Sequence, residues 1–346
     1  QKKDMDFVFQ DKSNMKKLDY ISCWFLKGGK YIFDNKAQLA FVSTNSICQG
    51  EQVALLWTHL LDKLEISFAF TSFKWANNAQ RNAGVTVVII GLRNIMFKPK
   101  YIYSNNTKKA TKNINAYLSS ASNIYITKLT NPISNFPKIS LGSAAYDGGH
   151  LMITKEEKNN IISRYPSAKK LFKRFIGSAE FIKGIERYCL WIEDNDLDFA
   201  NSIENVRNRL NMVRTFRKKS NRKQTLKSAS IPHKFTEDRY QKSSSLLIPI
   251  VASERRTHLV LGFLDSDNLI PNSARAVYNF EIYLFGVLSS SMHILWVKAV
   301  GGKLKTDYRY SAGICYNSFP FPDISKQRKE ELTQCTLKII DERLKH

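Results

Sequence analysis

The chain has 346 residues, with 53 Lys and Arg against 30 Asp and Glu, and so carries a formal net charge of +23. Its hydrophobic content of 43% and aromatic content of 12% suffice for two or three compact units, each with its own core. No apolar run reaches the roughly 20 residues that span a bilayer, and no signal peptide opens the chain. A nucleic acid therefore explains the charge better than an acidic membrane surface does.

The five cysteines are scattered, and none belongs to a CxxC pair. This distribution disfavours both a disulfide scaffold and a zinc ribbon, and the histidines show no metal-ligand spacing. We therefore expect no metal site, and a reducing, cytoplasmic compartment.

The first hundred residues alternate between helical and strand patterns. Apolar spacing predicts helices over Leu18–Phe33, which contains two adjacent glycines, and over Gln52–Leu61. Short apolar runs predict strands at Leu39–Ser43, Ile66–Phe70 and Val85–Ile90, and the β-branched residues of the last run favour a central strand. This order predicts the closing half of a doubly wound α/β sheet that ends near residue 97.

The middle of the chain has a different character. Residues 98–138 are rich in Asn, Ser, Thr and Tyr and predict an inter-domain connector with some extended structure. A helical pattern follows over Lys155–Phe175, with Thr154 placed to begin it. Ser202–Lys227 predicts one long helix, in which residues 206–227 hold nine basic side chains and no acidic one.

The last hundred residues mix strand and helix patterns. Leu246–Val251 and Leu259–Phe263 resemble strands, and Glu281–Val300 is an apolar segment of mixed helical and strand character. A polar amphipathic helix is predicted over Lys326–Lys345. We expect an α+β arrangement in this part of the chain, followed by a helical C-terminal segment.

Nine strings, taken together and in order, resemble one protein family. They are Leu18–Phe25, Phe41–Gln52, Phe70–Asn78, Val85–Gly91, Ser143–His150, Phe175–Trp191, Ser253–Arg256, Phe285–His293 and Tyr316–Pro322. Their order and their amino-acid sequences resemble the later catalytic motifs and the target-recognition region of MmeI-like (type IIL restriction-modification) DNA adenine methyltransferases. One string would be weak evidence, but the set covers nearly the whole chain.

The resemblance implies three regions. Residues 1–97 would be the C-terminal half of a class I methyltransferase sheet, residues 98–265 a DNA target-recognition domain, and residues 266–346 a C-terminal segment for recognition and packing. The parent activity would be methyl transfer from S-adenosylmethionine to adenine N6 in a short duplex DNA site, in the bacterial cytoplasm at the nucleoid.

Two motifs of such enzymes are absent from this sequence. There is no glycine-rich cofactor turn after an N-terminal strand, and no Asn/Asp-Pro-Pro-aromatic tetrad. Adenine N6 is a poor nucleophile because its lone pair is delocalised into the ring, and the tetrad supplies the acceptors and the aromatic ring that hold it. We therefore expect this chain alone to be inactive, with most of the cofactor site outside it. A partial sheet also exposes an edge, which predicts self-association of the isolated chain.

The resemblance also assigns residues to the base and the cofactor. Phe73 corresponds to a ring that lies against the flipped adenine and replaces the stacking lost from the duplex; without the resemblance, it would be interpreted as a core aromatic. Asp19 and Tyr20 border the cofactor by the same analogy, with a capping or packing role as the alternative.

Basic residues supply candidate contacts to DNA phosphates. On the predicted long helix these are Arg214, Arg217, Lys218 and Arg222, and near a predicted strand they are Arg255 and Arg256. Each phosphate that is neutralised releases a counterion, so the affinity they give is salt-sensitive and independent of sequence. The alternatives are a solvated helix face, and an internal pair between one arginine and Glu254.

Residues 302–310 correspond to the stretch that reads bases in the family. If this stretch is extended, Lys305, Asp307 and Arg309 point to one face. Lys or Arg matches guanine O6 and N7, whereas Asp accepts from cytosine N4. Lys305 and Asp307 would then read one G·C pair, and Arg309 a neighbouring pair; the alternative is an exposed ion pair of little energetic value. By analogy, Asn272 and Ser273 belong to the same surface.

Two other functions stay open. A DNA-specificity module could leave catalysis to a separate polypeptide, and the gene sequence just upstream would distinguish that case. An RNA-binding or RNA-modifying protein would show itself by preferring RNA over duplex DNA in a binding competition.

Overall fold

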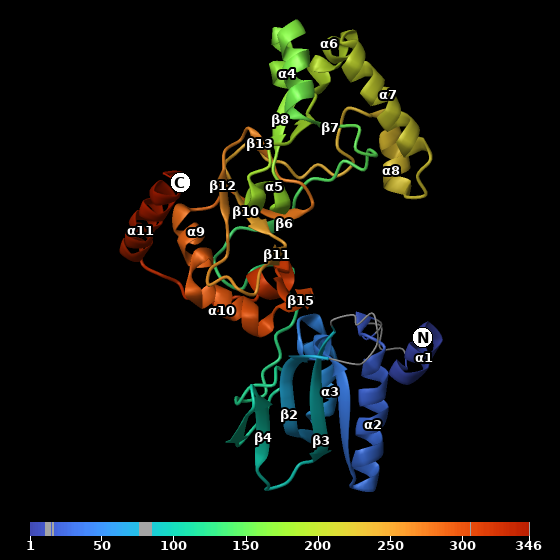
Figure 1. The fold of residues 1–346 in the computed structure, drawn as a ribbon, viewed down its shortest axis with the longest axis vertical. Coiled ribbons are helices and arrows are strands. Elements are labelled where there is room, and N and C mark those ends of the chain that lie inside the picture. The colour runs from blue at the N-terminus through green and yellow to red at the C-terminus, as the bar shows by residue number, and fades with distance from the viewer. Residues whose placement is uncertain (11–14, 16, 76–84, 305, 346) are drawn as a thin grey trace. The chain divides into compact units, whose positions relative to one another are not determined.

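The computed structural model describes residues 1–10, 15, 17–75, 85–304 and 306–345 (Figure 1). The described chain divides into two compact units. The first unit comprises residues 1–134, 252–256 and 292–321, and the second comprises residues 135–251, 257–291 and 322–346.

The first unit is built on a five-stranded sheet with the order β1-β3-β2-β4-β5. Its strands are β1 (Gln38–Thr44), β2 (Leu64–Lys74), β3 (Thr86–Asn94), β4 (Lys100–Ser104) and β5 (Thr107–Thr111). Strand β3 is antiparallel to both β1 and β2, so these two run in the same direction and their C-terminal ends lie at one edge of the sheet.

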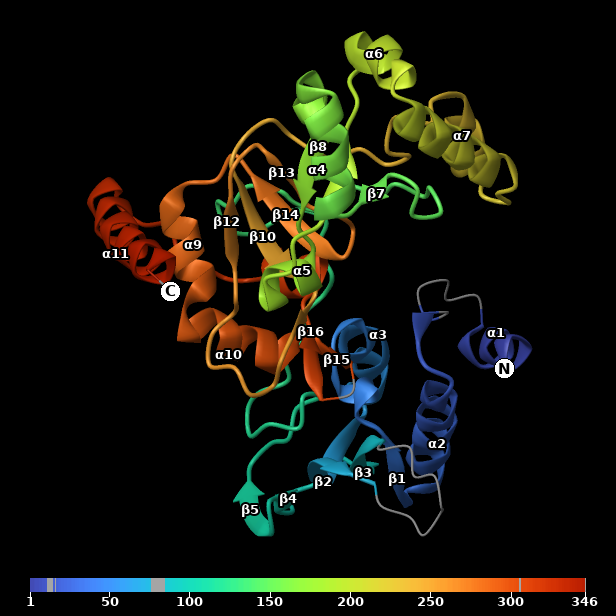
Figure 2. The same ribbon diagram turned by 45° about the horizontal axis from the view of Figure 1, so that its top comes forward.

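Three helices accompany this sheet (Figure 2): α1 (Lys2–Phe9), α2 (Ile21–Asn35) and α3 (Glu51–Leu60). Helix α2 leads into β1, and α3 connects β1 to β2. Phe25 of α2 packs edge-on against Phe41 and Trp57, with ring centroids 5.1 and 5.7 Å apart. Burial of these rings with the β-branched residues of β3 forms the core of the unit.

The predicted helices and strands of the first hundred residues are confirmed within a few residues at their ends. Helix α2 contains two glycines because it packs closely against β1 and α3 at these positions. A Cβ at Gly28 would lie 2.7 Å from Leu39, and one at Gly29 would lie 2.6 Å from Leu60.

Residues 98–138 contain the expected extended structure, but in its first part this belongs to the sheet of the first unit and not to a connector. Strands β4 and β5 form a hairpin that extends the sheet, since β4 pairs in parallel with β2. Asn105 and Asn106 form its turn with φ values of 46° and 63°, the conformation that two-residue hairpin loops require. Residues 112–134, all of them described, contain no further strand or helix.

The remaining part of the first unit contains α10 (Ser291–Val300), a short hairpin and a π-helical turn at Ala312–Tyr316. The hairpin strands are β15 (Gly302–Leu304) and β16 (Asp307–Arg309), and β16 also pairs with β11 (Val251–Ala252). The single extended stretch over residues 302–310, on which the shared face of Lys305, Asp307 and Arg309 was conditional, is therefore not observed. Leu304 pairs with Asp307, so the chain reverses between them.

The second unit contains two four-stranded sheets, with the orders β12-β10-β14-β6 and β13-β8-β9-β7. The first consists of β6 (Ile139–Leu141), β10 (Ser245–Pro249), β12 (Gly262–Leu264) and β14 (Ala274–Tyr278). The second consists of β7 (Met152–Ile153), β8 (Phe172–Phe175), β9 (Tyr188–Leu190) and β13 (Asn268–Leu269). The helices of the second unit are α4 (Lys155–Arg164), α5 (Ser178–Lys183), α6 (Leu197–Ser202), α7 (Glu204–Lys218), α8 (Lys223–Lys227), α9 (Ile282–Ser289) and α11 (Lys326–Leu344).

Several predicted elements of this region need correction. Thr154 is the N-cap of helix α4, in line with the predicted helix start, and it forms a reciprocal capping box with Glu157. The helix ends before Pro166, however, and the rest of the predicted segment is a 3₁₀ turn and a strand. The single long helix is wrong, because the chain bends between α7 and α8. The segment Glu281–Val300 is helical rather than mixed, while the C-terminal helix is confirmed as α11.

Among the described residues, no single helix is long and apolar enough to cross a membrane, although the bent pair of α9 and α10 passes on length and composition.

Candidate DNA-recognition and base-binding site

Phe73 lies near the C-terminal end of β2, opposite Val87 of β3, with 37% of its surface exposed. Another phenylalanine of the same strand, Phe70, is as exposed but stacks on Tyr103 at a centroid distance of 4.4 Å. Ligands of doubly wound sheets bind at the C-terminal ends of the strands. The position of Phe73 therefore suits a ring that meets a ligand at this edge.

Asp19 is held at the same edge by the turn that follows β1. Its carboxylate accepts a hydrogen bond of 2.6 Å from Ser46 Oγ, and its backbone N–H donates to Gln52 Oε1 at 3.1 Å. From the same turn, Asn45 Nδ2 donates to Ser72 Oγ at 3.4 Å, beside Phe73. The turn after β1 is thus hydrogen-bonded both to Asp19 and to Ser72, the residue that precedes Phe73 on β2.

Tyr20 turns its hydroxyl toward α1, where it donates to Asp4 Oδ2 at 3.0 Å. This hydrogen bond holds the pKa of Asp4 below its ordinary value. Asn45 and Ser46 were not singled out from the sequence, although they belong to one of the family strings. Their signal was the position of polar residues directly after the short apolar run that forms β1.

Asp307 and Arg309 lie on the same face of β16, because side chains two residues apart on a strand point the same way. Lys303 and Tyr308 occupy the other face, with Lys303 Nζ 5.1 Å from the Tyr308 ring centroid. Lys305 lies outside the described residues, so the predicted trio on one face is not described as a set.

The turn Ser253–Arg256 is joined to this hairpin. Asp307 Oδ1 accepts a hydrogen bond of 3.2 Å from the backbone N–H of Glu254. Arg255 and Arg256, which follow Glu254 directly, are exposed. The structure therefore groups two predicted phosphate contacts with two predicted base contacts. Asn272 and Ser273 are exposed as well, on the loop between β13 and β14 in the second unit.

The hairpin is anchored through the residue that follows it. Tyr310 is fully buried, and its hydroxyl lies 2.9 Å from Nε2 of His293 on α10. The ring of His293 also packs edge-on against Phe319, with centroids 4.4 Å apart. Burial lowers the pKa of His293 to about 3, so this imidazole is neutral at physiological pH.

This buried histidine predicts a pH dependence of stability. In the unfolded chain His293 binds a proton below about pH 6.5, whereas in the folded protein it stays neutral until the pH nears its folded pKa of about 3. The stability that His293 contributes is therefore present above pH 6.5 and is lost as the pH falls toward 3. The slope is about 1.4 kcal/mol per pH unit.

Denaturant unfolding at pH 7.5 and pH 5.0 tests this. The free energy of unfolding of the wild type should fall between these values by about 2 kcal/mol more than that of His293→Gln. Carboxylates that titrate in the same window affect both proteins equally. An identical pH dependence in the two proteins would show that His293 is not held neutral by burial.

The basic surface of the second unit divides into exposed and buried members. Arg214 and Lys218 on α7 are exposed, as predicted for phosphate contacts. Arg222, at the start of α8, is paired with Glu237, and its guanidinium lies 4.1 Å from the ring centroid of Tyr146. Pairing with Glu237 raises the pKa of Arg222.

The predicted phosphate contact of Arg217 is wrong. Its side chain is fully buried, and its guanidinium donates to five backbone carbonyl oxygens at distances of 2.8 to 3.2 Å. These belong to Ala145, Tyr146, Ser228, Ile231 and Lys234. Arg217 thus joins the turn before β7, helix α7 and the segment after α8. A side chain with this environment cannot reach a phosphate.

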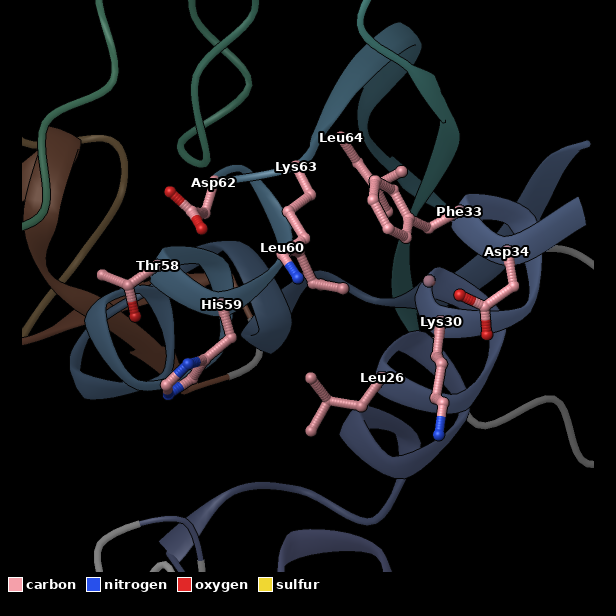
Figure 3. Close-up of a pocket in the computed structure, with 11 residues that line it drawn as sticks. Leu26, Lys30, Phe33, Asp34, Thr58, His59, Leu60, Asp62, Lys63 and Leu64 are labelled. Carbon is pink, nitrogen blue, oxygen red and sulfur yellow. The ribbon is translucent and has the colours of Figure 1, made fainter. Parts of the chain in front are cut away.

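A pocket of about 460 Å³ lies between α2 and the end of α3 (Figure 3). One wall carries Leu26, Lys30, Phe33 and Asp34 of α2, and the other carries Thr58 and His59 of α3. The pocket also includes Leu64, the first residue of β2, so it lies at the opposite edge of the sheet from Phe73. It is therefore separate from the candidate base-binding edge.

In the part of the chain that the structure describes, no three His, Cys, Asp or Glu side chains gather in a group that could hold a metal ion.

The sheet with Phe73 and Asp19 at its C-terminal edge, and the hairpin and basic side chains elsewhere in the chain, are the features expected of a methyltransferase domain combined with a recognition region. A family model of the DNA-methyltransferase domain of MmeI matches residues 1–104, and one of the MmeI target recognition domain matches residues 120–323. The chain belongs to the MmeI family, as its motifs indicated.

Two relatives extend this finding. The chain is 45% identical over 342 residues to DNA methyltransferase A of Bacillus subtilis (strain 168), across 98% of its own length and 39% of that protein's. It is also similar to the solved structure of MmeI, a Type IIL restriction-modification enzyme in complex with DNA, with a TM-score of 0.91 and 37% identity over 100% of this chain and 47% of that one. The predicted fold class is confirmed. The chain spans less than half the length of either relative.

Proposed function

We propose that this chain is part of a bacterial DNA methyltransferase that transfers a methyl group from S-adenosylmethionine to adenine N6 in a specific duplex site. The observation that carries the proposal is the similarity of the whole chain to MmeI, solved with DNA, at a TM-score of 0.91. The exposed ring of Phe73 at the C-terminal edge of the sheet supports it independently. The protein would act in the cytoplasm, at the nucleoid.

In this proposal the chain contributes to base and cofactor binding but lacks the complete active site. Phe73 stacks on the flipped adenine, which compensates for stacking lost from the duplex. The exposed carboxylate of Asp19 is a hydrogen-bond acceptor that fits the amino or hydroxyl groups of S-adenosylmethionine, which supplies the methyl group when bound. Tyr20 would support this edge through its contact with α1. The rest of the cofactor site, and the acceptors for the adenine amino group, would lie in other parts of the protein.

Recognition of DNA falls to the hairpin and the basic surfaces. Lys305 and Asp307 would read one G·C pair and Arg309 a neighbouring pair, and Asn272 and Ser273 of the second unit would supply further base contacts. Each good base contact should contribute about 1–3 kcal/mol of discrimination. Arg214, Lys218, Arg222, Arg255 and Arg256 would contact phosphates and give salt-dependent affinity. The regions 1–97, 98–265 and 266–346 would divide these tasks, and the isolated chain would self-associate.

Sequencing of methylated bases in DNA from cells that carry the full-length gene tests the proposed activity. N6-methyladenine is expected in one short asymmetric motif, and only when the gene is present. Modification of cytosine, or none at all, would overturn the proposal. Specific duplex binding without methylation would instead favour a specificity module that works with a separate catalytic chain.

The reading role of the hairpin predicts a change in specificity. The double variant Lys305→Glu with Asp307→Arg exchanges donor and acceptor, so the full-length protein should methylate a motif that differs from the wild-type motif at one base pair. The matched control is Arg328→Glu with Glu331→Arg, which reverses an exposed ion pair on α11 and should leave the motif unchanged. An unchanged motif in the hairpin variant, with methylation retained, would eliminate this role.

A further inference from the structure

The turn after β1, residues 45–52, lies within the string Phe41–Gln52 that resembles the family, but the proposed function gives it no role. Three of its residues bond to the base-binding edge of the sheet. Ser46 donates to Asp19, Gln52 accepts from the backbone of Asp19, and Asn45 donates to Ser72 beside Phe73. Movement of this turn would therefore displace the edge.

The same turn bonds to the recognition hairpin through two other residues. Gln49 Oε1 accepts a hydrogen bond of 3.1 Å from the backbone N–H of Lys303 in β15. The backbone N–H of Gly50 donates to the carbonyl oxygen of Val300, just before the hairpin, at 3.2 Å. All of these residues belong to the first unit. One short segment thus contacts both the base-binding edge and the base-reading hairpin.

The conformation of Gly50 favours this double contact. Its φ of 56° and ψ of −140° lie in a region that residues with a Cβ rarely adopt. A Cβ at this position would make an ordinary van der Waals contact, 3.6 Å from the backbone nitrogen of Gly302, so glycine is favoured here by backbone conformation and not by lack of space. Glycine therefore allows the chain to leave the turn and enter α3 while it stays next to β15.

The turn also has little freedom to adjust locally. The side chain of Ile47 is fully buried, and its carbonyl oxygen accepts a hydrogen bond of 2.8 Å from Trp57 Nε1 in the core. Packed interiors transmit displacements because they hold few voids. A shift of the hairpin at Lys303 would consequently be passed to the edge that holds Asp19 and Phe73.

We propose that the turn 45–52 couples sequence reading to placement of the target base, with Gln49 as a positioning residue that fixes the hairpin against the base-binding edge. The inference rests on the proposed function, because it assigns the two sites that the turn connects. In this proposal Gln49 acts through its hydrogen bond to the backbone of Lys303. The ligand that meets both sites at once is a duplex carrying the recognised site, with its target adenine out of the stack.

Two variants of Gln49 separate this role from a general structural one. Gln49→Glu keeps an acceptor at the same reach for the Lys303 N–H, whereas Gln49→Leu keeps the size of the side chain but removes the acceptor. Gln327→Leu makes the same change at an exposed position on α11 and is the matched control. A misplacement near 1 Å can cost on the order of a hundredfold in rate, so loss of one of the two hydrogen bonds should cost about tenfold.

The experiment uses the full-length protein, the duplex motif found by sequencing, and a second duplex with one recognition base pair changed. Single-turnover methylation is measured on both, together with the fluorescence of 2-aminopurine in place of the target adenine. We expect Gln49→Leu to methylate the cognate duplex about tenfold more slowly, with a reduced 2-aminopurine signal and a smaller preference for the cognate site. Thermal stability and duplex affinity should stay near those of the wild type, and Gln49→Glu and Gln327→Leu should behave like the wild type.

The outcomes can be distinguished. If the wild type methylates no adenine, the proposed function fails, and this inference fails with it. If the wild type is active but Gln49→Leu keeps its rate and its preference, the coupling role alone is overturned. An equal loss in Gln49→Leu and Gln49→Glu, accompanied by a lower melting temperature, would also overturn it, since the residue would then serve stability only.

Discussion

Replacing Arg217 by methionine is expected to lower the free energy of unfolding by about 3–5 kcal/mol. Methionine fills most of the aliphatic volume of the side chain but donates no hydrogen bond. Five carbonyl oxygens, from Ala145 to Lys234 along the chain, would then lose the guanidinium that satisfies them. A buried acceptor without a partner costs about 1–3 kcal/mol. Water that enters the site would satisfy some of the five carbonyl oxygens, so the total loss is smaller than five times that cost.

The same substitution three residues earlier provides the control. Arg214 is exposed on α7 and bonds only locally to Asn211 among the contacts described for its side chain. Arg214→Met should therefore change the free energy of unfolding by no more than about 0.5 kcal/mol. Urea unfolding, monitored with a spectroscopic probe in the second unit, measures the free energy of unfolding of both variants. If Arg217→Met is as stable as Arg214→Met and loses DNA affinity instead, the phosphate role inferred from the sequence would be correct after all.

The sequence contains a signal for the burial of Arg217, but charge conceals it. Val206, Leu210 and Val213 are the buried residues of α7, and their spacing continues to position 217. An apolar stripe at helical spacing marks the face that packs on the core. Arg217 therefore occupies a core position of the helix, although its neighbours Lys218 and Lys219 make it resemble one member of an exposed basic cluster. The position of a residue around the helix distinguishes a buried arginine from an exposed one, whereas the local density of basic residues does not.

The fold was predictable where its elements depend on local pattern. Helices α2 and α3 and strands β1 to β3 follow from apolar spacing and β-branched density within short windows. Strands β4 and β5 were missed because the pairing of β4 with β2 joins residues more than 30 positions apart, and because its polar face resembles a linker. The Asn105–Asn106 pair was the local sign of a hairpin there.

The recognition hairpin shows a different limit. Alternation over residues 302–310 fits one extended strand as well as two short ones, and the sequence between Leu304 and Asp307 contains neither Gly nor Pro to signal a chain reversal. The relation of Asp307 to Arg309 survives, because both lie on β16. What could not be inferred is the partner across the hairpin, which depends on where the chain reverses.

The largest expected effect on activity concerns Phe73. Phe73→Ala in the full-length protein should slow single-turnover methylation by about 10- to 100-fold, since stacking on an aromatic side chain contributes about 1–3 kcal/mol per base. Phe73→Tyr retains the ring and should retain most of the rate. Phe70→Ala is the matched control: it removes a ring of similar exposure from the same strand, but one that stacks on Tyr103. Phe70→Ala should therefore lower the free energy of unfolding but leave the rate of methylation near that of the wild type.

A mismatched substrate tests why the ring matters. Extruding an adenine costs a few kcal/mol in a paired duplex and less when the base opposite cannot pair. If Phe73 compensates for the energy of leaving the stack, Phe73→Ala should recover part of its lost rate on a duplex with a mismatch at the target adenine, and the wild type should gain less. Equal defects on paired and mismatched duplexes would mean that Phe73 does not stabilise the extruded base, and its exposure at the end of β2 would need another explanation.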